Sequence, residues 1–177
     1  MKNSQFSLLR SKTLLLNFQF NKGFTMLELL ISIAVLGVIA SVVILAINPN
    51  HQIGKARDSR RKTDVASLAK VVEEYYVENF RTLPATGTYV SNDSLIADPS
   101  DANGNGWIPQ ILTNQTKVLP IDPLNDATHF YRYCADTATF SLNYEIDAFL
   151  EADTNLMSSD GGDDPNRYEI GTLKTQC

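Results

Sequence analysis

The chain has 177 residues, 44% of them hydrophobic and 20% charged, and a formal net charge of −5. This length has room for one membrane segment and one small globular domain. The charge is unevenly spread, because residues 84–177 hold four bases and fourteen acids. Such an acidic region argues against nonspecific nucleic-acid binding and suits a solvated exterior or cation binding.

Residues 1–23 are basic and contain no acid. Their four bases leave a net charge of −9 on the rest of the chain. Residues 24–83 are nearly balanced, with seven bases and six acids. The bases of the first segment are Lys2, Arg10, Lys12 and Lys22.

An uninterrupted apolar run extends from Phe24 to Ile47, and its only charged residue is Glu28. As a helix of 24 residues it would be about 36 Å long, enough to cross a hydrocarbon core of about 30 Å. A carboxylate near the centre of such a helix costs about 2.5–3.5 kcal/mol, and less toward the end. Because the run contains no cation, Glu28 needs a partner from outside its own helix.

The chain reads Gly-Phe-Thr-Met-Leu-Glu at residues 23–28. This junction, followed by the apolar run, resembles the leader junction of type IV pilins and type II secretion pseudopilins. The resemblance implies that a membrane peptidase cuts between Gly23 and Phe24 and methylates Phe24. It also implies that Glu28 meets the N-terminal amine of a neighbouring subunit during filament assembly. The resemblance covers residues 22 to about 83 and is much weaker beyond.

The expected pairing of Glu28 has an electrostatic reason. Opposite charges attract strongly at low dielectric, while one helix holds the Phe24 amine and the Glu28 carboxylate apart along its axis. We therefore expect the pair to form between two chains.

Two features depart from the family pattern. The segment before the junction is longer than the leaders of the commonest pilin class, which fits the longer-leader members or an upstream start site. Leu45 stands where many members have proline, whereas this chain has Gly37 and Pro49. The position of any local unwinding in a filament therefore stays open.

A secretory signal or a plain membrane anchor is the alternative interpretation of this region. The run is too long for the apolar part of a typical signal, although Val38-Ile39-Ala40 resembles a small-residue cleavage site.

A cluster of bases follows the apolar run. One interpretation is contact with lipid headgroups or with acids of neighbouring subunits, and the other is DNA contact, as in competence filaments. No aromatic side chains are interleaved with these bases, which favours the first interpretation, so nucleic acid is not an expected partner. The cluster comprises Lys55, Arg57, Arg60, Arg61 and Lys62, with Asp58 among them.

A helical pattern resumes after Asn48 and covers residues 48–83. Apolar side chains recur at three- and four-residue spacing, and Arg60 with Asp64 makes a favourable pair four residues apart. The helix should stop before Pro84, because the residue preceding a proline disfavours the α conformation. The apolar stripe consists of Val65, Leu68, Ala69, Val72, Tyr75, Tyr76 and Phe80.

Residues 84–128 are rich in turn-forming residues and are interpreted as a long connection, with a short helix near 108–113. Strands are predicted at 129–134, at 140–148 and around Tyr168 and Ile170. Strict alternation over 140–148 predicts one buried and one solvated face. Residues 119–123 are similar to the segment that precedes the sheet in major pseudopilins.

These elements predict an α+β fold, in which a long N-terminal helix packs on a small antiparallel sheet. The resemblance implies the same pilin-like roll. The predicted regions are a leader (1–23), an assembly helix (24–47), its amphipathic continuation (48–83) and an acidic head (84–177).

Two cysteines, Cys134 and Cys177, would lie in an oxidising compartment if the head is exported, and a disulfide is then expected. Closing a loop of about 43 residues would contribute roughly 4 kcal/mol. The resemblance also implies a disulfide, since pilins commonly close their C-terminal region with one. The alternative is a buried free Cys134 and a thiol in the tail.

Two loops are candidates for Ca²⁺. In the first, Asp101, Asn103 and Asn105 match the first, third and fifth ligand positions of a calcium loop. Leu112, however, stands where the twelfth-position glutamate is expected, and an ordinary Asn/Gly turn is the alternative.

The second candidate is the acidic loop that holds Asp160, Asp163 and Asp164, with Asp153 shortly before it. Major pseudopilins bind calcium in a comparable loop. A solvated acidic loop is the alternative.

No catalytic constellation emerges. His51 and His129 lack convincing local partners, and no nucleophile-elbow, zinc-protease or phosphate-loop motif occurs. We expect a substrate of enzymes rather than an enzyme, with no required cofactor.

The sequence therefore predicts a structural subunit of a type IV pilus or a type II secretion-type pseudopilus. Its expected partners are other pilin subunits, a prepilin peptidase, inner-membrane assembly machinery and the lipid bilayer. It would span the cytoplasmic membrane once, with its head outside, and then join a surface or periplasmic filament.

The alternative function is a membrane-anchored extracytoplasmic domain that binds Ca²⁺ or another ligand and forms no filament. Within the family, adhesive pilus, secretion pseudopilus and DNA-uptake filament all stay open.

Overall fold

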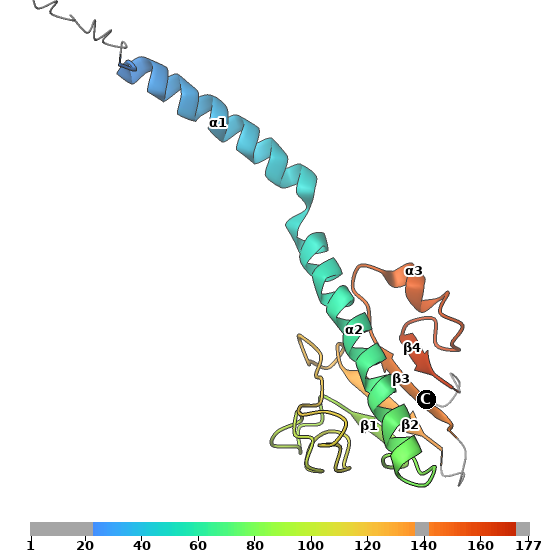
Figure 1. Ribbon diagram of the computed structural model, residues 1–177. Coiled ribbons are helices and arrows are strands. Elements are labelled where there is room, and N and C mark those ends of the chain that lie inside the picture. The colour runs from blue at the N-terminus through green and yellow to red at the C-terminus, as the bar shows by residue number, and fades with distance from the viewer. Residues whose placement is uncertain (1–22, 137–141, 173–177) are drawn as a thin grey trace, which may run out of the picture. The chain divides into compact units, whose positions relative to one another are not determined.

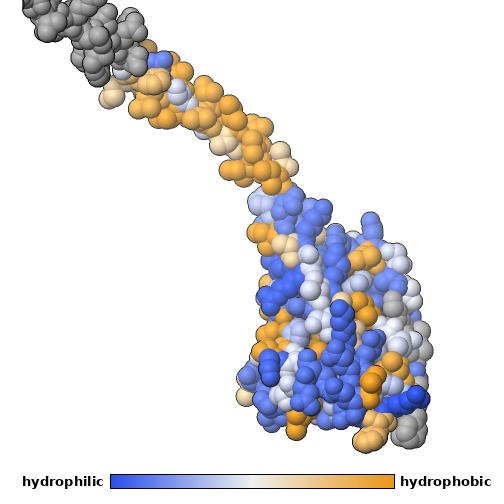
Figure 2. Space-filling view, viewed as in Figure 1, coloured by the Kyte–Doolittle hydropathy of each residue, from blue (hydrophilic) through white to orange (hydrophobic). Residues whose placement is uncertain are grey.

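The computed structural model describes residues 23–136 and 142–172, and it contains two compact units, residues 1–46 and 47–177. The first unit is dominated by α1 (Met26–Ile47). Thr25 precedes it, and its Oγ1 accepts the backbone N–H of Glu28 at 3.2 Å, as an N-cap residue does. The apolar side chains of α1 that are described are all exposed, and the side of α1 seen in Figure 2 is mostly hydrophobic.

The length of α1 suits a bilayer. Its 22 residues extend about 33 Å, against a hydrocarbon core of about 30 Å. Among the described residues, Met26–Ile44 is the stretch long and apolar enough to cross a membrane. An exposed apolar surface of this size needs lipid or other chains to cover it.

The helical pattern is interrupted once, at Asn48. This residue has φ 46 and ψ 76, in the left-handed region, and its carbonyl accepts the N–H groups of His51 and Gln52. Pro49 is the first residue of α2 (Pro49–Glu78), a position that proline favours because no hydrogen bond is lost there.

α2 buries one face, as the apolar stripe predicts. Val65, Leu68 and Val72 are fully buried. The prediction that Phe80 extends the stripe is wrong: α2 ends at Glu78, Phe80 and Arg81 have positive φ, and Phe80 is 91% exposed. The left-handed turn after α2 points this side chain away from the core.

The sheet is an antiparallel meander in the order β1-β2-β3-β4. Its strands are β1 (Gly87–Val90), β2 (Tyr131–Ala135), β3 (Tyr144–Ala148) and β4 (Tyr168–Gly171). Ile146 at its centre lies opposite Tyr133 of β2 and Ile170 of β4. α2 runs across one face of the sheet (Figure 1), and the predicted α+β class is confirmed.

The core lies between α2 and the sheet. The helix contributes its buried stripe, and the strands contribute Tyr131, Tyr133, Tyr144 and Ile146. The hydroxyl of Tyr131 donates to Asp64 and that of Tyr144 to Glu73, both at 2.9 Å. Each tyrosine therefore keeps its polar end satisfied at the edge of the core.

The interpretation of residues 84–128 needs two corrections. β1 forms at the start of this region, at an edge of the sheet where four residues pair with β2. The predicted helix near 108–113 does not form; Asn103 bridges to Ile111, and Asp101 to Val118. The physical reason is that Trp107, Ile108 and Leu112 are all drawn into the core, which a short exposed helix would not permit.

The prediction of a solvated face on β3 is also wrong. All five residues of β3 are buried, including Glu145 and Asp147; residues 140–141 lie outside the described residues. Asp147 pairs with Arg132 at 2.6 Å and with Arg167. The alternating pattern correctly assigned apolar and polar residues to opposite faces of β3. The polar face is nevertheless buried, because the chain that follows β3 covers it.

The connection between β3 and β4 includes a short helix, α3 (Thr154–Met157). Arg167, the last residue of this connection before β4, stacks on Phe130, with its guanidinium carbon 4.5 Å from the ring centre. It also donates a hydrogen bond to the Phe130 carbonyl. These contacts hold the connection against the sheet.

Candidate functional site

The predicted processing junction lies at the start of α1. Gly23 and Phe24 precede the helix, and Phe24 is 84% exposed. No atom lies within 4 Å of a Cβ built on Gly23. The bond between the two residues is thus sterically accessible in the described part of the chain.

Glu28 lies in the first turn of α1, where it is the one acidic side chain of the helix. Its side chain is exposed among apolar neighbours, with Leu27 and Leu29 also exposed. A carboxylate on an apolar helix has a strong need for a cation once lipid or other helices surround it. The position fits a contact made with another molecule.

The basic cluster at the start of α2 is largely used within the second unit. Arg61 is fully buried and reaches three carboxylates: Asp58 at 2.9 Å, Asp122 at 2.6 Å and Glu151 at 2.6 Å. Arg57 also pairs with Glu151. These bases therefore stabilise the fold, which argues further against a DNA-binding role.

Asp58 organises the same region through the backbone. Its carboxylate accepts the N–H groups of Glu151, Ala152 and Asp153 at 2.7–3.0 Å. Burial opposes the charged form, but these donors and Arg61 lower the pKa of Asp58. Hydrogen bonds from Arg57, and then from Arg61, lower the pKa of Glu151 to about 2.

Asp122 and Glu151 were not singled out by sequence reasoning. Asp122 lies in the segment 119–123, whose likeness to the pseudopilin segment was the available signal. Glu151 had no signal, because it meets Arg61 only after β3 has joined the sheet.

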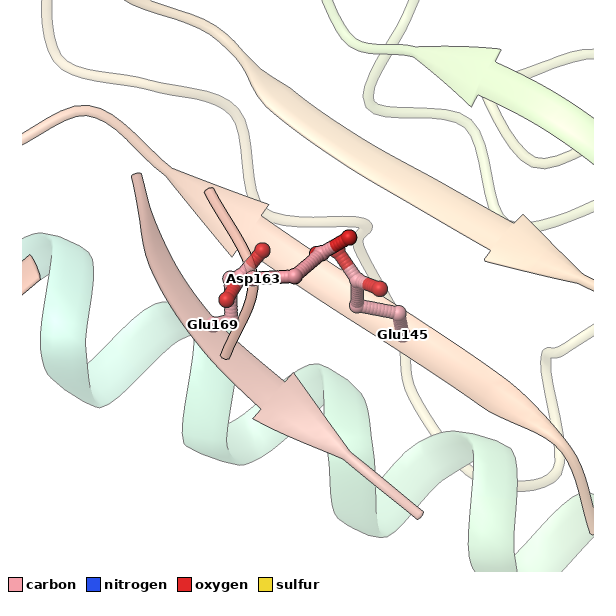
Figure 3. A group of neighbouring side chains, drawn as sticks. All are labelled: Glu145, Asp163 and Glu169. Carbon is pink, nitrogen blue, oxygen red and sulfur yellow. The ribbon is translucent and has the colours of Figure 1, made fainter. Parts of the chain in front are cut away.

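A second cluster of carboxylates lies on the sheet face opposite α2 (Figure 3). Oxygen atoms of Glu145 on β3, Glu169 on β4 and Asp163 in the loop between these strands lie within 4.8 Å of one another. Glu145 and Glu169 are buried and Asp163 is exposed. Burial, and then the neighbouring Glu145 carboxylate, raise the pKa of Glu169 to about 7.

This cluster includes one of the three predicted acidic ligands of its loop. Asp160 instead shapes the loop, because its carboxylate accepts the N–H groups of Gly162 and Glu169. Asp164 accepts from Asn166. Sequence reasoning missed Glu145 and Glu169, and the available signal was acidic residues on neighbouring predicted strands.

The first candidate loop forms a polar turn. Asp101 accepts the backbone N–H and the side-chain amide of Asn103, and also the side-chain amide of Asn105. The two asparagines thus present donors rather than oxygens to Asp101, an arrangement that favours the turn interpretation.

Comparison with known proteins places these features in a family. The family model described as "Prokaryotic N-terminal methylation motif" matches residues 19–46. The type II secretion system core protein G of Klebsiella michiganensis is 31% identical over 107 residues, which are 59% of this chain and 69% of that protein. The chain belongs to the type II secretion pseudopilin family. No solved structure matches.

Other pseudopilins show the same level of similarity. The core protein G of Pectobacterium carotovorum is 30% identical over 58% of this chain and 61% of its own length. That of Aeromonas hydrophila is 28% identical over 57% and 66%. The chain thus spans about 61–69% of the length of these relatives.

Two further predictions concern the cysteines and a histidine of this pseudopilin. Cys134 is buried on β2, whereas Cys177 lies outside the described residues, so their disulfide stays a prediction. His129 lies 2.9 Å from Asp126 and edge-on to Phe149. The prediction that His129 lacks a local partner is therefore wrong, because Asp126 lies three residues before it in the same loop.

Proposed function

We propose that this chain is a structural subunit of a type II secretion-type pseudopilus or a related type IV filament, without catalytic activity of its own. The observation that carries the proposal is α1, whose apolar side chains are exposed on all sides beside a Gly23-Phe24 junction. An isolated chain in water could not keep such a surface exposed. A bilayer before assembly, and neighbouring helices afterwards, would cover it.

We propose the following order of processing and assembly. A prepilin peptidase cuts after Gly23, releases the basic leader and methylates the new amine at Phe24. The chain then spans the cytoplasmic membrane once, with its head outside. Inner-membrane assembly machinery extracts it into a surface or periplasmic filament. There, the Phe24 amine of one copy pairs with Glu28 of another, because a single helix holds its own two groups apart along the axis.

The test is the intact mass and N-terminal sequence of the full chain after co-expression with a prepilin peptidase. The proposal expects a chain that begins at Phe24 with one added methyl group. Electron microscopy of cells that also contain the assembly machinery should then show filaments. An uncut chain, or one that begins near Ser41, would instead support a plain anchor or a secretory signal.

We also propose that Ca²⁺ binds at Glu145, Asp163 and Glu169. The Oε2 atom of Glu169 is buried and accepts no hydrogen bond within the described residues. Two buried carboxylates side by side repel one another, and a cation between them removes that cost. Carboxylate oxygens without sulfur or nitrogen donors are the ligand set that Ca²⁺ prefers.

Thermal unfolding of the full chain with and without Ca²⁺ tests this second proposal. Ca²⁺ at a hundredfold excess over its Kd should add about 2.7 kcal/mol of stability, and Glu169→Gln should abolish the gain. Asp101→Asn is the matched control in the other candidate loop and should leave the gain unchanged. The reverse pattern would place the ion at Asp101, and no stabilisation of the wild-type chain would refute the proposal.

A further inference from the structure

The solvent-facing side of α2 continues along nearly the whole helix. Opposite its buried stripe, exposed residues recur at three- and four-residue intervals. This surface, here called the outer face of α2, includes Lys55, Ser59, Thr63, Ser67, Lys70, Glu74 and Val77. In Figure 2 the part of the molecule along α2 is mostly blue and white, which marks it as hydrophilic.

Charge is divided along the outer face. Its N-terminal half carries the bases Lys55 and Arg60, and its C-terminal end carries the acids Glu73, Glu74 and Glu78. Lys70 lies three and four residues before two of these acids, which offset its charge. The face is therefore basic at one end and acidic at the other.

Lys55 and Glu74 have no hydrogen-bond or ion-pair partner within the described part of the chain. Among the other charges of the outer face, Arg60 lies 3.4 Å from Asp64, Glu73 accepts from Tyr144, and Glu78 accepts from Gln115. Lys70 also lacks such a partner among the described residues, but it lies between the two ends and next to the acids that offset its charge. Lys55 and Glu74 are thus a base and an acid at opposite ends of the face that remain available to another molecule.

Small side chains separate the two ends. Ser59, Thr63, Ala66 and Ser67 line a shallow groove of about 560 Å³, with lysines at its margins. Residues of this size permit another protein to approach the helix closely.

From this arrangement we infer that the outer face of α2 binds a second copy of this chain that is shifted along the helix, so that Lys55 of one copy meets Glu74 of the other. A parallel copy at the same level would place base against base and acid against acid. The two residues are 19 positions apart, so the matching shift is about 28 Å. The inference rests on the proposed filament, because copies anchored in one membrane by α1 have the same orientation.

A shifted contact leaves the basic end of one copy and the acidic end of the other open. Such a heterologous contact adds copies without limit, whereas an antiparallel pair would close as a dimer. Each exposed ion pair is weak, but it is repeated at every subunit of a filament.

The test is carbodiimide cross-linking of filaments made by the full chain in cells with the assembly machinery. This reagent joins a lysine amine directly to a carboxylate. About 28 Å of rigid helix separates Lys55 from Glu74 within one chain, so a peptide that links them must come from two chains. The inference expects this linked peptide, found by mass spectrometry, and a yield that falls with added salt.

Charge reversal supplies the controls. Lys55→Glu and Glu74→Lys should each abolish the link between positions 55 and 74, because two carboxylates or two amines cannot be joined by this reagent; their loss verifies which side chains are linked. The double variant Lys55→Glu/Glu74→Lys should restore the link, now between the carboxylate at position 55 and the amine at position 74. Lys117→Glu, at an exposed lysine outside α2, should leave the yield unchanged. Both α2 sites are exposed, so thermal unfolding should show the variants to be folded.

Filaments that lack this link would overturn the inference and leave the proposed function standing. A double variant that fails to restore the link between positions 55 and 74 would also overturn it. In an antiparallel dimer the two copies of Thr63 would lie near the midpoint of positions 55 and 74, so a spontaneous disulfide in Thr63→Cys would refute the shift. Wild-type cells without filaments would count against the proposed function, and the inference that rests on it would fail as well, because chains held at one level in a membrane cannot be shifted by about 28 Å.

Discussion

Glu28 is a charged residue on an apolar helix that offers it no cation, so a cationic partner has to come from elsewhere. Its neighbours on α1 are exposed apolar side chains, and α1 has no basic residue. A lone carboxylate is costly in lipid, which is why we propose that Glu28 forms its contact with another subunit after cleavage. The predictions at this scale concern the charge and the junction.

Glu28→Ala should leave cleavage after Gly23 intact and strongly reduce filament formation. Loss of about 1.4 kcal/mol per subunit contact lowers association about tenfold. The measurements are the N-terminal sequence of the product and the filament yield by electron microscopy. Normal filament yield from this variant would refute the pairing with the Phe24 amine.

Gly23→Leu should leave the leader attached, because a bulky side chain would occupy the accessible space beside the cut bond. Intact mass spectrometry should show residues 1–23 still present. Gly37→Leu is the matched control, since Gly37 is another exposed glycine with no atom within 4 Å of its built Cβ. Efficient cleavage of Gly23→Leu would remove the main support for the junction.

At the scale of elements, α2 is attached to the head by polar as well as apolar contacts. Apolar residues in its centre cover the sheet, while Arg61 nearer its start binds carboxylates from two other segments. A buried guanidinium with three carboxylates is stable only while every partner is present. This ion cluster around Arg61 should therefore be sensitive to the loss of Arg61, which is fully buried.

Arg61→Met should lower the free energy of unfolding by about 3–5 kcal/mol, since it leaves buried carboxylates without their cation. Urea unfolding of the full chain in detergent measures the change. Arg60→Met is the control: the Arg60 side chain is 62% exposed in its pair with Asp64, so the pair should contribute less than about 1 kcal/mol. Equal effects of the two substitutions would show that burial of Arg61 is not energetically important.

At the scale of the whole molecule, stability should depend on pH through the carboxylates of this ion cluster. The pKa of Glu151 is lowered to about 2 in the folded chain, from an ordinary value of 4.5. A folded-state pKa below the unfolded one contributes stability that is present above pH 4.5 and is lost as the pH falls toward 2. Asp58, whose pKa is also lowered, acts in the same direction.

The urea midpoint should therefore fall between pH 5 and pH 3, and Glu151→Gln should flatten this dependence. The variant should also be less stable than the wild-type chain at pH 7, because Arg57 and Arg61 lose a charged partner. Glu74→Gln, on the outer face of α2, should retain the wild-type pH profile. An unchanged profile in Glu151→Gln would refute the role of this carboxylate.

Some of these features could be predicted from local patterns and others could not. The buried stripe of α2 and the strand β4 follow from periodicity, and the fold class follows from their order. The ion cluster around Arg61 could not be predicted, because Asp122 is 61 residues away and Glu151 is 90 residues away. Phe80 fitted the stripe by spacing, but the backbone turns left-handed at this position.

The sequence by itself determined what depends on neighbours along the chain: the junction at residues 23–28, the apolar α1 and the register of the stripe on α2. Tertiary structure decided which polar groups are buried. Glu145, Asp147 and Arg61 look like ordinary charged residues in sequence, yet all three are buried. A charge is tolerated inside a protein only where groups from distant segments converge on it, and local sequence does not contain that convergence.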